Sequence, residues 1–205
     1  LEENQTQALG FFGIFAIVNH ALAPTISIEI INFFSYDYFF ISSSIASIIA
    51  FFIALSINVK NSMVDERKNG QNFTQLLKNK KLKIVCFIMF LVGGSFLTCL
   101  NFAAVFTKSI NVLPITIFFL SYTVIALIMR IFFGWLPDKY GQVTFCKPAL
   151  ILYGLSIGIL GLSINYISVM SAGILFGISH ALVYPSIYTL ALRFTDISNK
   201  SKAFS

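Results

Sequence analysis

Long apolar stretches alternate with short polar breaks along the whole chain. Each stretch runs for about 21 to 25 residues, and at roughly 1.5 Å of rise per residue this length crosses the roughly 30 Å hydrocarbon core of a bilayer as an α-helix. The pattern predicts an all-α membrane protein with about six transmembrane helices. We place them at residues 8–31, 39–59, 84–107, 112–136, 145–165 and 168–192.

The composition indicates that lipid is the solvent. The chain is 57% hydrophobic and 11% charged, whereas a soluble domain has about 25% charged residues. A water-soluble protein is therefore nearly excluded. The net charge of +6 forms no basic stripe, because the Lys and Arg residues sit mostly between apolar runs. We therefore expect membrane lipid around the helices and no nucleic-acid partner.

The distribution of cations predicts the topology. Six crossings place both ends of the chain and two connections on one side of the membrane, and 12 of the 14 Lys and Arg residues fall there. Only Lys108 falls on the opposite face, and Arg130 lies inside the fourth helix. The positive-inside rule makes the cation-rich side cytoplasmic. We therefore expect a multi-pass protein of a cytoplasmic (inner) membrane, with both ends of this chain cytoplasmic.

One long connection, residues 61–83, separates two helices from four. Its basic residues indicate a cytoplasmic linker, and they also suit contact with anionic lipid. A weak repeat relates "NQTQALG" near the start to "NKSKAFS" at the end, with the period expected of a transporter built from two parallel six-helix halves. Residues 1–60 would then end a first half, and residues 84–205 would form four helices of the second.

The most specific motif is "RIFFGWLPDKYGQ", at the end of the fourth helix. Arg130, Gly134 and Asp138 recur at i, i+4 and i+8, so they share one face of the helix and its continuation. Gly134 allows close approach of another helix, and Gly141 allows a sharp turn. Asp138 can pair with Arg130 or Lys139, or cap a neighbouring helix. The cluster is predicted to latch one conformation at the inner side.

This stretch resembles the cytoplasmic loop motif of the major facilitator superfamily, roughly G-x-L-x-D-R-x-G-R, in its second copy. It matches at Gly134, Leu136, Asp138, Lys139 and Gly141 and departs at Pro137 and Gln142. The last apolar segment, with Gly173, Gly177 and Pro185, is similar to the family's tenth helix. The resemblance implies an incomplete major-facilitator-type bundle, helices five to ten, which needs the missing helices of the same pattern to form a complete carrier.

Two histidines lie near mid-membrane, about 18 Å of helix rise from the starts of the predicted first and sixth helices. A titratable group at that depth is a candidate for proton coupling or substrate contact, although each imidazole can instead bond a neighbouring helix. The candidate cavity or proton-coupling residues are Asn19, His20, His180 and Tyr184.

Prolines interrupt the same two helices. Pro24 cannot donate to the carbonyl of His20, nor Pro185 to that of Ala181, so both helices are expected to kink. The segment "NHALAPTIS" around Pro24 resembles the family's fifth-helix antiporter motif, with Ala23 in place of a glycine. The resemblance implies proton antiport.

No nucleophile with a base, no set of metal ligands and no phosphate-binding loop stands out in the sequence. We therefore predict neither an enzyme nor an ATP-driven pump, and no cofactor or metal. The predicted function is secondary transport: proton-coupled export of a small organic solute by alternating access. The alternatives are an uptake permease of the same fold, and a truncated chain or helical membrane protein without transport activity.

Overall fold

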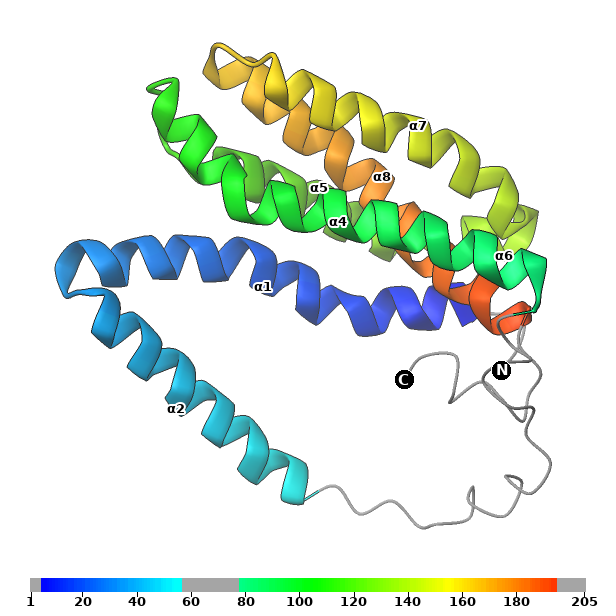
Figure 1. The fold of residues 1–205 in the computed structure, drawn as a ribbon, viewed down its shortest axis with the longest axis horizontal. Coiled ribbons are helices and arrows are strands. Elements are labelled where there is room, and N and C mark those ends of the chain that lie inside the picture. The colour runs from blue at the N-terminus through cyan, green and yellow to red at the C-terminus, as the bar shows by residue number, and fades with distance from the viewer. Residues whose placement is uncertain (1–4, 57–77, 195–205) are drawn as a thin grey trace.

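The computed structural model describes residues 5–56 and 78–194, and that part of the chain is helical with no strand (Figure 1). In chain order the helices are α1 (Gln5–Phe33), α2 (Tyr36–Leu55), α4 (Lys80–Ser109), α5 (Ile117–Phe133), α6 (Leu136–Tyr140), α7 (Gln142–Gly161) and α8 (Tyr166–Arg193). Helix α1 packs with the bundle that α4 to α8 form, and α2 meets α1 at one end and diverges from it.

Five of the described helices, α1, α2, α4, α7 and α8, are long and apolar enough to cross a membrane. Their positions confirm the predicted helical membrane fold. The remaining span, the fourth of the six predicted, is shorter than expected, because α5 has only 17 residues. At about 1.5 Å per residue, α5 alone covers roughly 25 Å.

Both ends of the predicted span at 112–136 differ from the structure. The helix begins only at Ile117, because Pro114 lacks an N–H and disfavours helical dihedrals at Leu113. At the other end, Gly134 and Trp135 interrupt the helix but keep right-handed helical dihedrals. The Lys139 N–H donates to the Trp135 carbonyl at 3.2 Å, so α6 continues the course of α5.

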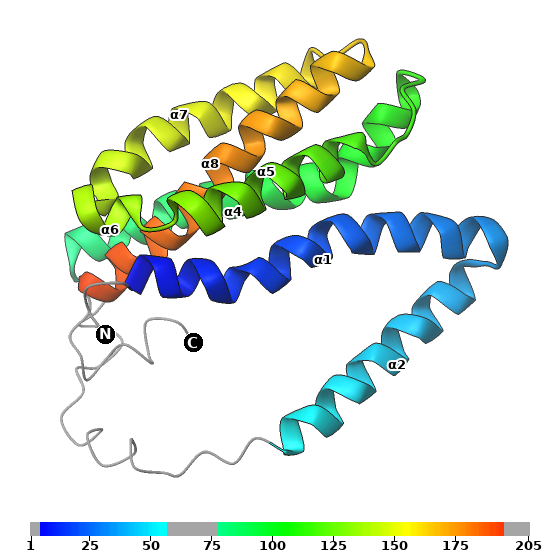
Figure 2. The same ribbon diagram turned by 180° about the vertical axis from the view of Figure 1, so that it is seen from behind.

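The centre of the bundle is the contact between α5 and α8, and α7 packs along α8 (Figures 1 and 2). A Cβ on Gly173 would lie 2.7 Å from the Phe118 carbonyl oxygen, and one on Gly177 would lie 2.6 Å from the Tyr122 carbonyl oxygen. These glycines, four residues apart, bring the two backbones into direct contact. Helix α1 packs against α5 and α8, and α4 contacts α8.

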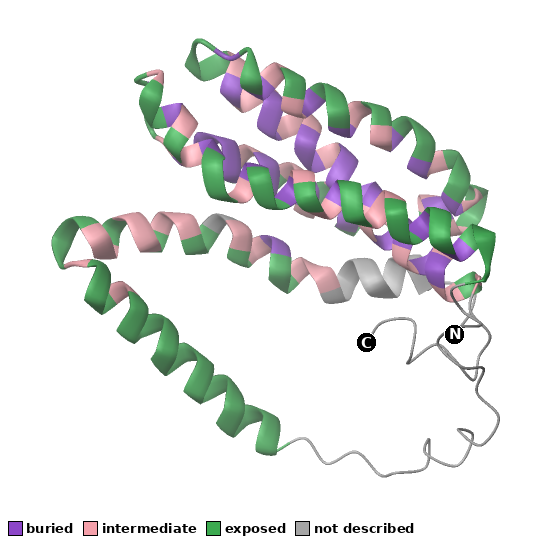
Figure 3. Cartoon of the chain, in the orientation of Figure 1, coloured by how far each residue is buried: buried purple, intermediate pink, exposed green. Residues whose placement is uncertain are grey.

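Burial is concentrated where these helices meet. Figure 3 shows buried residues along α5 and α8, whereas α2 is exposed over nearly its whole length and has no buried residue. Many exposed side chains of α2 are large and apolar, such as Phe51 and Phe52. In water so large an apolar surface would be unfavourable, so these faces belong in lipid or against other helices.

Helix α4 starts before its predicted first residue, 84, and takes in the last residues of the predicted linker at 61–83. Helix α4 begins at Lys80 because the Asn79 side chain caps it, accepting hydrogen bonds from the backbone N–H groups of Lys81 and Leu82 at 3.0 and 3.4 Å. Most of the linker lies outside the described residues. The second copy of the weak repeat also lies outside them.

Candidate functional site

The hydroxyl of Tyr122 in α5 lies between the two predicted histidines. It is 3.0 Å from Nδ1 of His20 in α1 and 3.3 Å from Nδ1 of His180 in α8. The hydroxyl group has one hydrogen, so it donates to one imidazole and accepts from the other. Three helices are therefore joined by one polar chain inside an apolar bundle.

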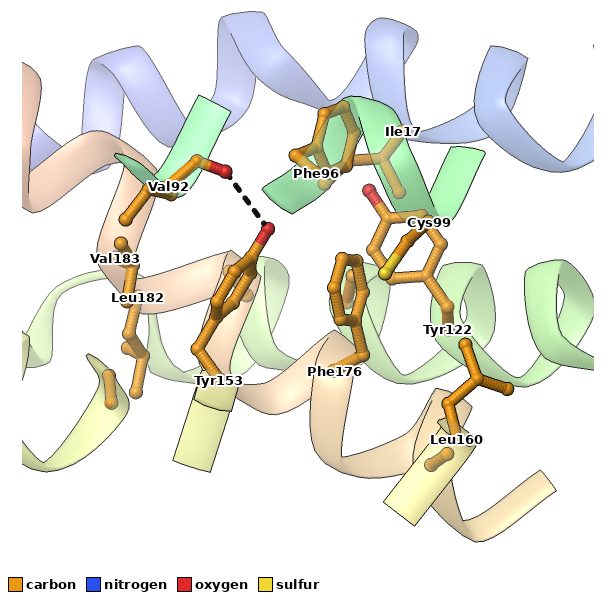
Figure 4. Packing of buried hydrophobic residues seen from close by; sticks show 14 of the residues in the cluster. Ile17, Val92, Phe96, Cys99, Tyr122, Tyr153, Leu160, Phe176, Leu182 and Val183 are labelled. Atoms are coloured by element: carbon orange, nitrogen blue, oxygen red, sulfur yellow. Dashed lines mark hydrogen bonds between the residues drawn. The ribbon is translucent and has the colours of Figure 1, made fainter. Parts of the chain in front are cut away.

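Aromatic rings enclose this chain. The ring of Phe96 in α4 stacks on His180 with a centroid distance of 4.7 Å and meets His20 at 5.0 Å. The ring of Phe176 lies 5.3 Å from that of Tyr122. Figure 4 shows Phe96, Phe176 and Tyr122 converging from three helices. Beside them, the Tyr153 hydroxyl in α7 donates to the Val92 carbonyl in α4 at 3.3 Å.

The spacing of residues along α8 explains this arrangement. Phe176, His180 and Tyr184 recur every four residues and therefore project from one face. Gly177, one residue after Phe176, lets α5 approach closely enough to bring Tyr122 against that face. Tyr122 is fully buried as a result. Within the described part of the chain, His180 Nε2 is buried without a hydrogen-bond partner, which a purely structural histidine would seldom tolerate.

A cavity of about 410 Å³ opens beside this polar chain, between α1, α4, α5 and α8. Helices α1, α5 and α8 supply the polar residues that line it, and α4 supplies the ring of Phe96. The lining includes His20, Arg130, His180, Tyr184 and Tyr188, and Pro185 also faces it. The structure thus brings together three of the four predicted cavity residues.

Asn19 is the exception among those four. It is exposed, and it does not line this cavity. Adjacent residues on a helix point about 100° apart, so a cavity that takes in His20 need not reach its neighbour.

Arg130 reaches this cavity from the end of α5. Its side chain is only 6% exposed, and its guanidinium lies against Gly13 of α1, where a Cβ would overlap the Nη1 atom. Gly13 therefore provides the space that the guanidinium occupies. The sequence assigned Arg130 to the inner gate and not to the cavity, because helical spacing relates it to Asp138 but gives no information about α1.

The rest of the predicted gating motif lies at the α5–α6–α7 corner. Asp138 accepts a hydrogen bond from Nε2 of Gln142 at 3.2 Å, so a residue that departs from the family motif supports its carboxylate. The Lys139 ammonium lies 5.3 Å from the Trp135 ring and 5.1 Å from the Tyr140 ring. The latch between Arg130 and Asp138 stays a prediction.

The two glycines of the motif have different roles. Gly141 has a φ of 99°, which confirms the predicted sharp turn before α7. A Cβ on Gly134 would lie 2.5 Å from the Arg130 carbonyl oxygen of its own segment. Gly134 therefore serves the bend between α5 and α6, and the expected approach of another helix at this point stays a prediction.

The two predicted kink prolines, Pro24 and Pro185, both lie inside helices that continue past them. Within the described residues, no group of three His, Cys, Asp or Glu side chains is placed to hold a metal ion.

Comparison with known proteins identifies a family. The family model of the Major Facilitator Superfamily matches residues 2–205. No curated protein and no solved structure matches the chain.

Proposed function

Because the chain belongs to the major facilitator superfamily, whose members are membrane transporters, we propose that it exports a small organic solute by proton-coupled alternating access. Residues 1–60 contribute the end of one half, residues 84–205 contribute four helices of the other, and 61–83 link them. The protein lies in a cytoplasmic membrane with both ends of this chain inside. The remaining helices of the family pattern complete the carrier.

The observation that carries this proposal is the hydrogen-bonded chain of His20, Tyr122 and His180. In the proposed division, α1 belongs to the first half, whereas α5 and α8 belong to the second. The hydrogen bonds of Tyr122 therefore connect the two halves, near the middle of α1 and α8 and beside the cavity. A rocking motion that separates the halves must break them.

Protonation rearranges this bridge. With neutral imidazoles, the Tyr122 hydroxyl donates to one Nδ1 and accepts from the other. A proton added to the accepting imidazole turns its Nδ1 into a donor, so the hydroxyl hydrogen loses its acceptor. The other charged or titratable groups that line the cavity are Arg130, Tyr184 and Tyr188. A proton at this point thus changes the contact between the halves, as proton coupling requires.

The inner gate is the contact of α1 with α5 and α6. Arg130 meets Gly13 of α1, and α6, which carries Asp138 and Lys139, also packs against α1. Opening the cavity on this side must separate these surfaces. We therefore assign the motif, including Gly134 and Gly141, to stabilising the conformation closed on the inner side.

Transport in proteoliposomes tests the proposal. The full-length protein is reconstituted, a pH gradient is imposed, and uptake of a solute panel is measured. We expect saturable, gradient-driven flux that is lost in His20→Gln and in His180→Gln. The control is Asn19→Ala, next to His20 but outside the cavity, which should transport normally. Flux that does not saturate would indicate a channel, and normal gradient-driven flux in both histidine variants would refute the proposal.

Uptake by the same fold is the second candidate. It is favoured by the sharing of one cavity by Arg130 and both histidines. A proton on an imidazole adds positive charge beside a guanidinium, which strengthens the binding of a negatively charged solute and does not compete with it. Proton and solute then move together, as in uptake driven by a proton gradient. The antiport implied by the resemblance around Pro24 requires the opposite.

A further inference from the structure

We propose that the cavity beside Tyr122 binds a small organic anion, with the anionic group held by Arg130 and the apolar body against the aromatic wall. The inference rests on the proposed function, since it names the class of solute that this cavity takes. It follows from charge, shape and lining residues together.

The charge of the cavity is positive. Arg130 supplies a permanent cation, and none of the described residues that line the cavity is an Asp or Glu. Three carboxylates fall in the described part of the chain. Glu29 and Asp37 lie far along α1 and in α2, and Asp138 lies in α6, outside the cavity lining. An anionic solute therefore meets attraction from Arg130 and no like charge from the described lining.

The guanidinium is accommodated by the backbone around it. Its side chain is 6% exposed, and Gly13 leaves the space in which Nη1 lies. A buried guanidinium is a favourable neighbour for an anion, because charge attraction is strong where water is scarce. The planar guanidinium offers paired N–H donors that match the two oxygens of a carboxylate or sulfonate. A cationic solute would add a second positive charge at the same place.

The remaining walls suit a flat apolar body. Phe96 and Tyr184 have ring centroids 5.9 Å apart, and Tyr184 and Tyr188 are also 5.9 Å apart. These rings continue into the apolar side chain of Ile17 and the ring of Pro185. The volume, about 410 Å³, is at the low end of the roughly 300–1,000 Å³ of ligand pockets. The fitting ligand is thus a small anion with an aromatic or compact apolar part.

Binding of probes matched in size and different in charge tests the inference. Benzenesulfonate is a permanent anion, benzenesulfonamide is neutral and benzyltrimethylammonium is a permanent cation. Equilibrium dialysis with the purified full-length protein measures affinity in detergent, without a membrane or gradient. We expect benzenesulfonate to bind more tightly than the other two, and Arg130→Gln to weaken it by about ten- to hundred-fold, as loss of a hydrogen bond to a charged group does.

Two variants act as controls. Arg130→Lys keeps the positive charge but loses the paired N–H donors of the guanidinium, and it should retain part of the affinity. Lys108→Gln removes a cation from a separate groove, shared with Glu29 at the far end of α1 and α4, and should bind benzenesulfonate like the wild type. A thermal unfolding scan of each variant shows whether it is folded.

Three results would overturn the inference: no binding of benzenesulfonate, equal or tighter binding of the neutral or cationic probe, or unchanged binding in folded Arg130→Gln. These results are separate from a failure of proton coupling. Gradient-driven flux of a cation would refute the anion site and leave the coupling intact, whereas anion binding without gradient-driven flux would do the reverse.

Discussion

At the residue scale, the hydroxyl of Tyr122 is the smallest feature with a predicted effect on transport. It touches His20 and His180 from a fully buried position. Tyr122→Phe keeps the ring and removes the bridge. Because two imidazole nitrogens then lose a partner, we expect a cost of about 1–3 kcal/mol in unfolding free energy and loss of the response of transport to a pH gradient. Thermal unfolding and proteoliposome flux measure the two effects.

Tyr153→Phe is the matched control. Tyr153 is also buried, and its hydroxyl donates to the Val92 carbonyl, away from the histidines. Removing this single hydrogen bond should cost about 0.5–1.5 kcal/mol and leave the pH response intact. If Tyr122→Phe and Tyr153→Phe respond alike to pH, the hydroxyl bridge has no part in coupling.

The sequence identified the histidines but not the residue that joins them. His20 and His180 stand out because a titratable group is rare in an apolar run. Tyr122 does not, since a tyrosine is ordinary in an aromatic-rich helix and its partners lie on other helices. The polar triplet Ser-Tyr-Thr at 121–123, inside an otherwise apolar segment, was the available signal. Arg130 was identified as part of the gating motif. The direction of its side chain depends on Gly13, which is more than a hundred residues away in the sequence.

At the element scale, the contact between α5 and α8 depends on Gly177. A Cβ there would lie 2.6 Å from the Tyr122 carbonyl oxygen, so Gly177→Ala forces the two helices apart. We expect a loss of about 1–3 kcal/mol in stability, as for overpacked cores, and weakened transport because Tyr122 is displaced. Gly158→Ala in α7 is the control, since a Cβ at Gly158 meets no atom within 4 Å. Melting temperatures in detergent compare the two variants, and equal melting would contradict the packing argument.

The bend between α5 and α6 carries the proposed gate. Asp138→Asn keeps an amide oxygen for Gln142 but removes the charge. If Asp138 stabilises the closed inner side, its loss shifts the conformational equilibrium by the roughly 1–3 kcal/mol of typical coupling, and transport should fall about fivefold or more with little change in melting temperature. Asp37→Asn, in the first turn of α2, is the control. Unchanged flux in Asp138→Asn would show that the latch assignment is wrong.

Helix existence followed from the sequence, and helix ends did not. Apolar length alone predicts a span, so α1, α2, α4, α7 and α8 were located. The ends depend on local chemistry that length does not contain. Asn79 caps α4, which begins four residues before the predicted start, and Pro114 delays the start of α5. Gly134 divides the fourth span into α5 and α6 because its position in the bend has no room for a Cβ.

At the scale of the whole molecule, the proposed boundary between the halves passes through the cavity. Helix α1 contacts α5 and α8 across it, and α2 leads away from the bundle (Figure 1). The two sides share His20, Tyr122 and His180 as a titratable contact and Arg130 as a fixed charge. Any solute bound there interacts with both halves at once. On the proposed function, solute and proton act on the same contact between the halves.

This shared location predicts how proton and solute are coupled. If a proton on His20 or His180 raises the affinity for an anion at Arg130, the anion must raise the affinity for the proton by the same factor. The two are then loaded together and carried in the same direction. In proteoliposomes with an imposed pH gradient, loading of this kind makes benzenesulfonate accumulate in the alkaline compartment, following protons down their gradient. That outcome would select uptake, the second candidate, over proton-driven export.

The antiport implied around Pro24 predicts the reverse, accumulation in the acidic compartment, because proton and solute would have to displace each other. Accumulation in the acidic compartment would refute simultaneous binding of proton and anion in one cavity. It would leave the proposal of a proton-coupled transporter intact. His20→Gln should abolish the dependence on the gradient in either case, and Asn19→Ala should preserve it. The compartment that accumulates the anion therefore distinguishes transport in the same direction as the proton from exchange for it. Electrostatic attraction inside one cavity favours simultaneous binding, whereas exchange requires that proton and anion exclude each other.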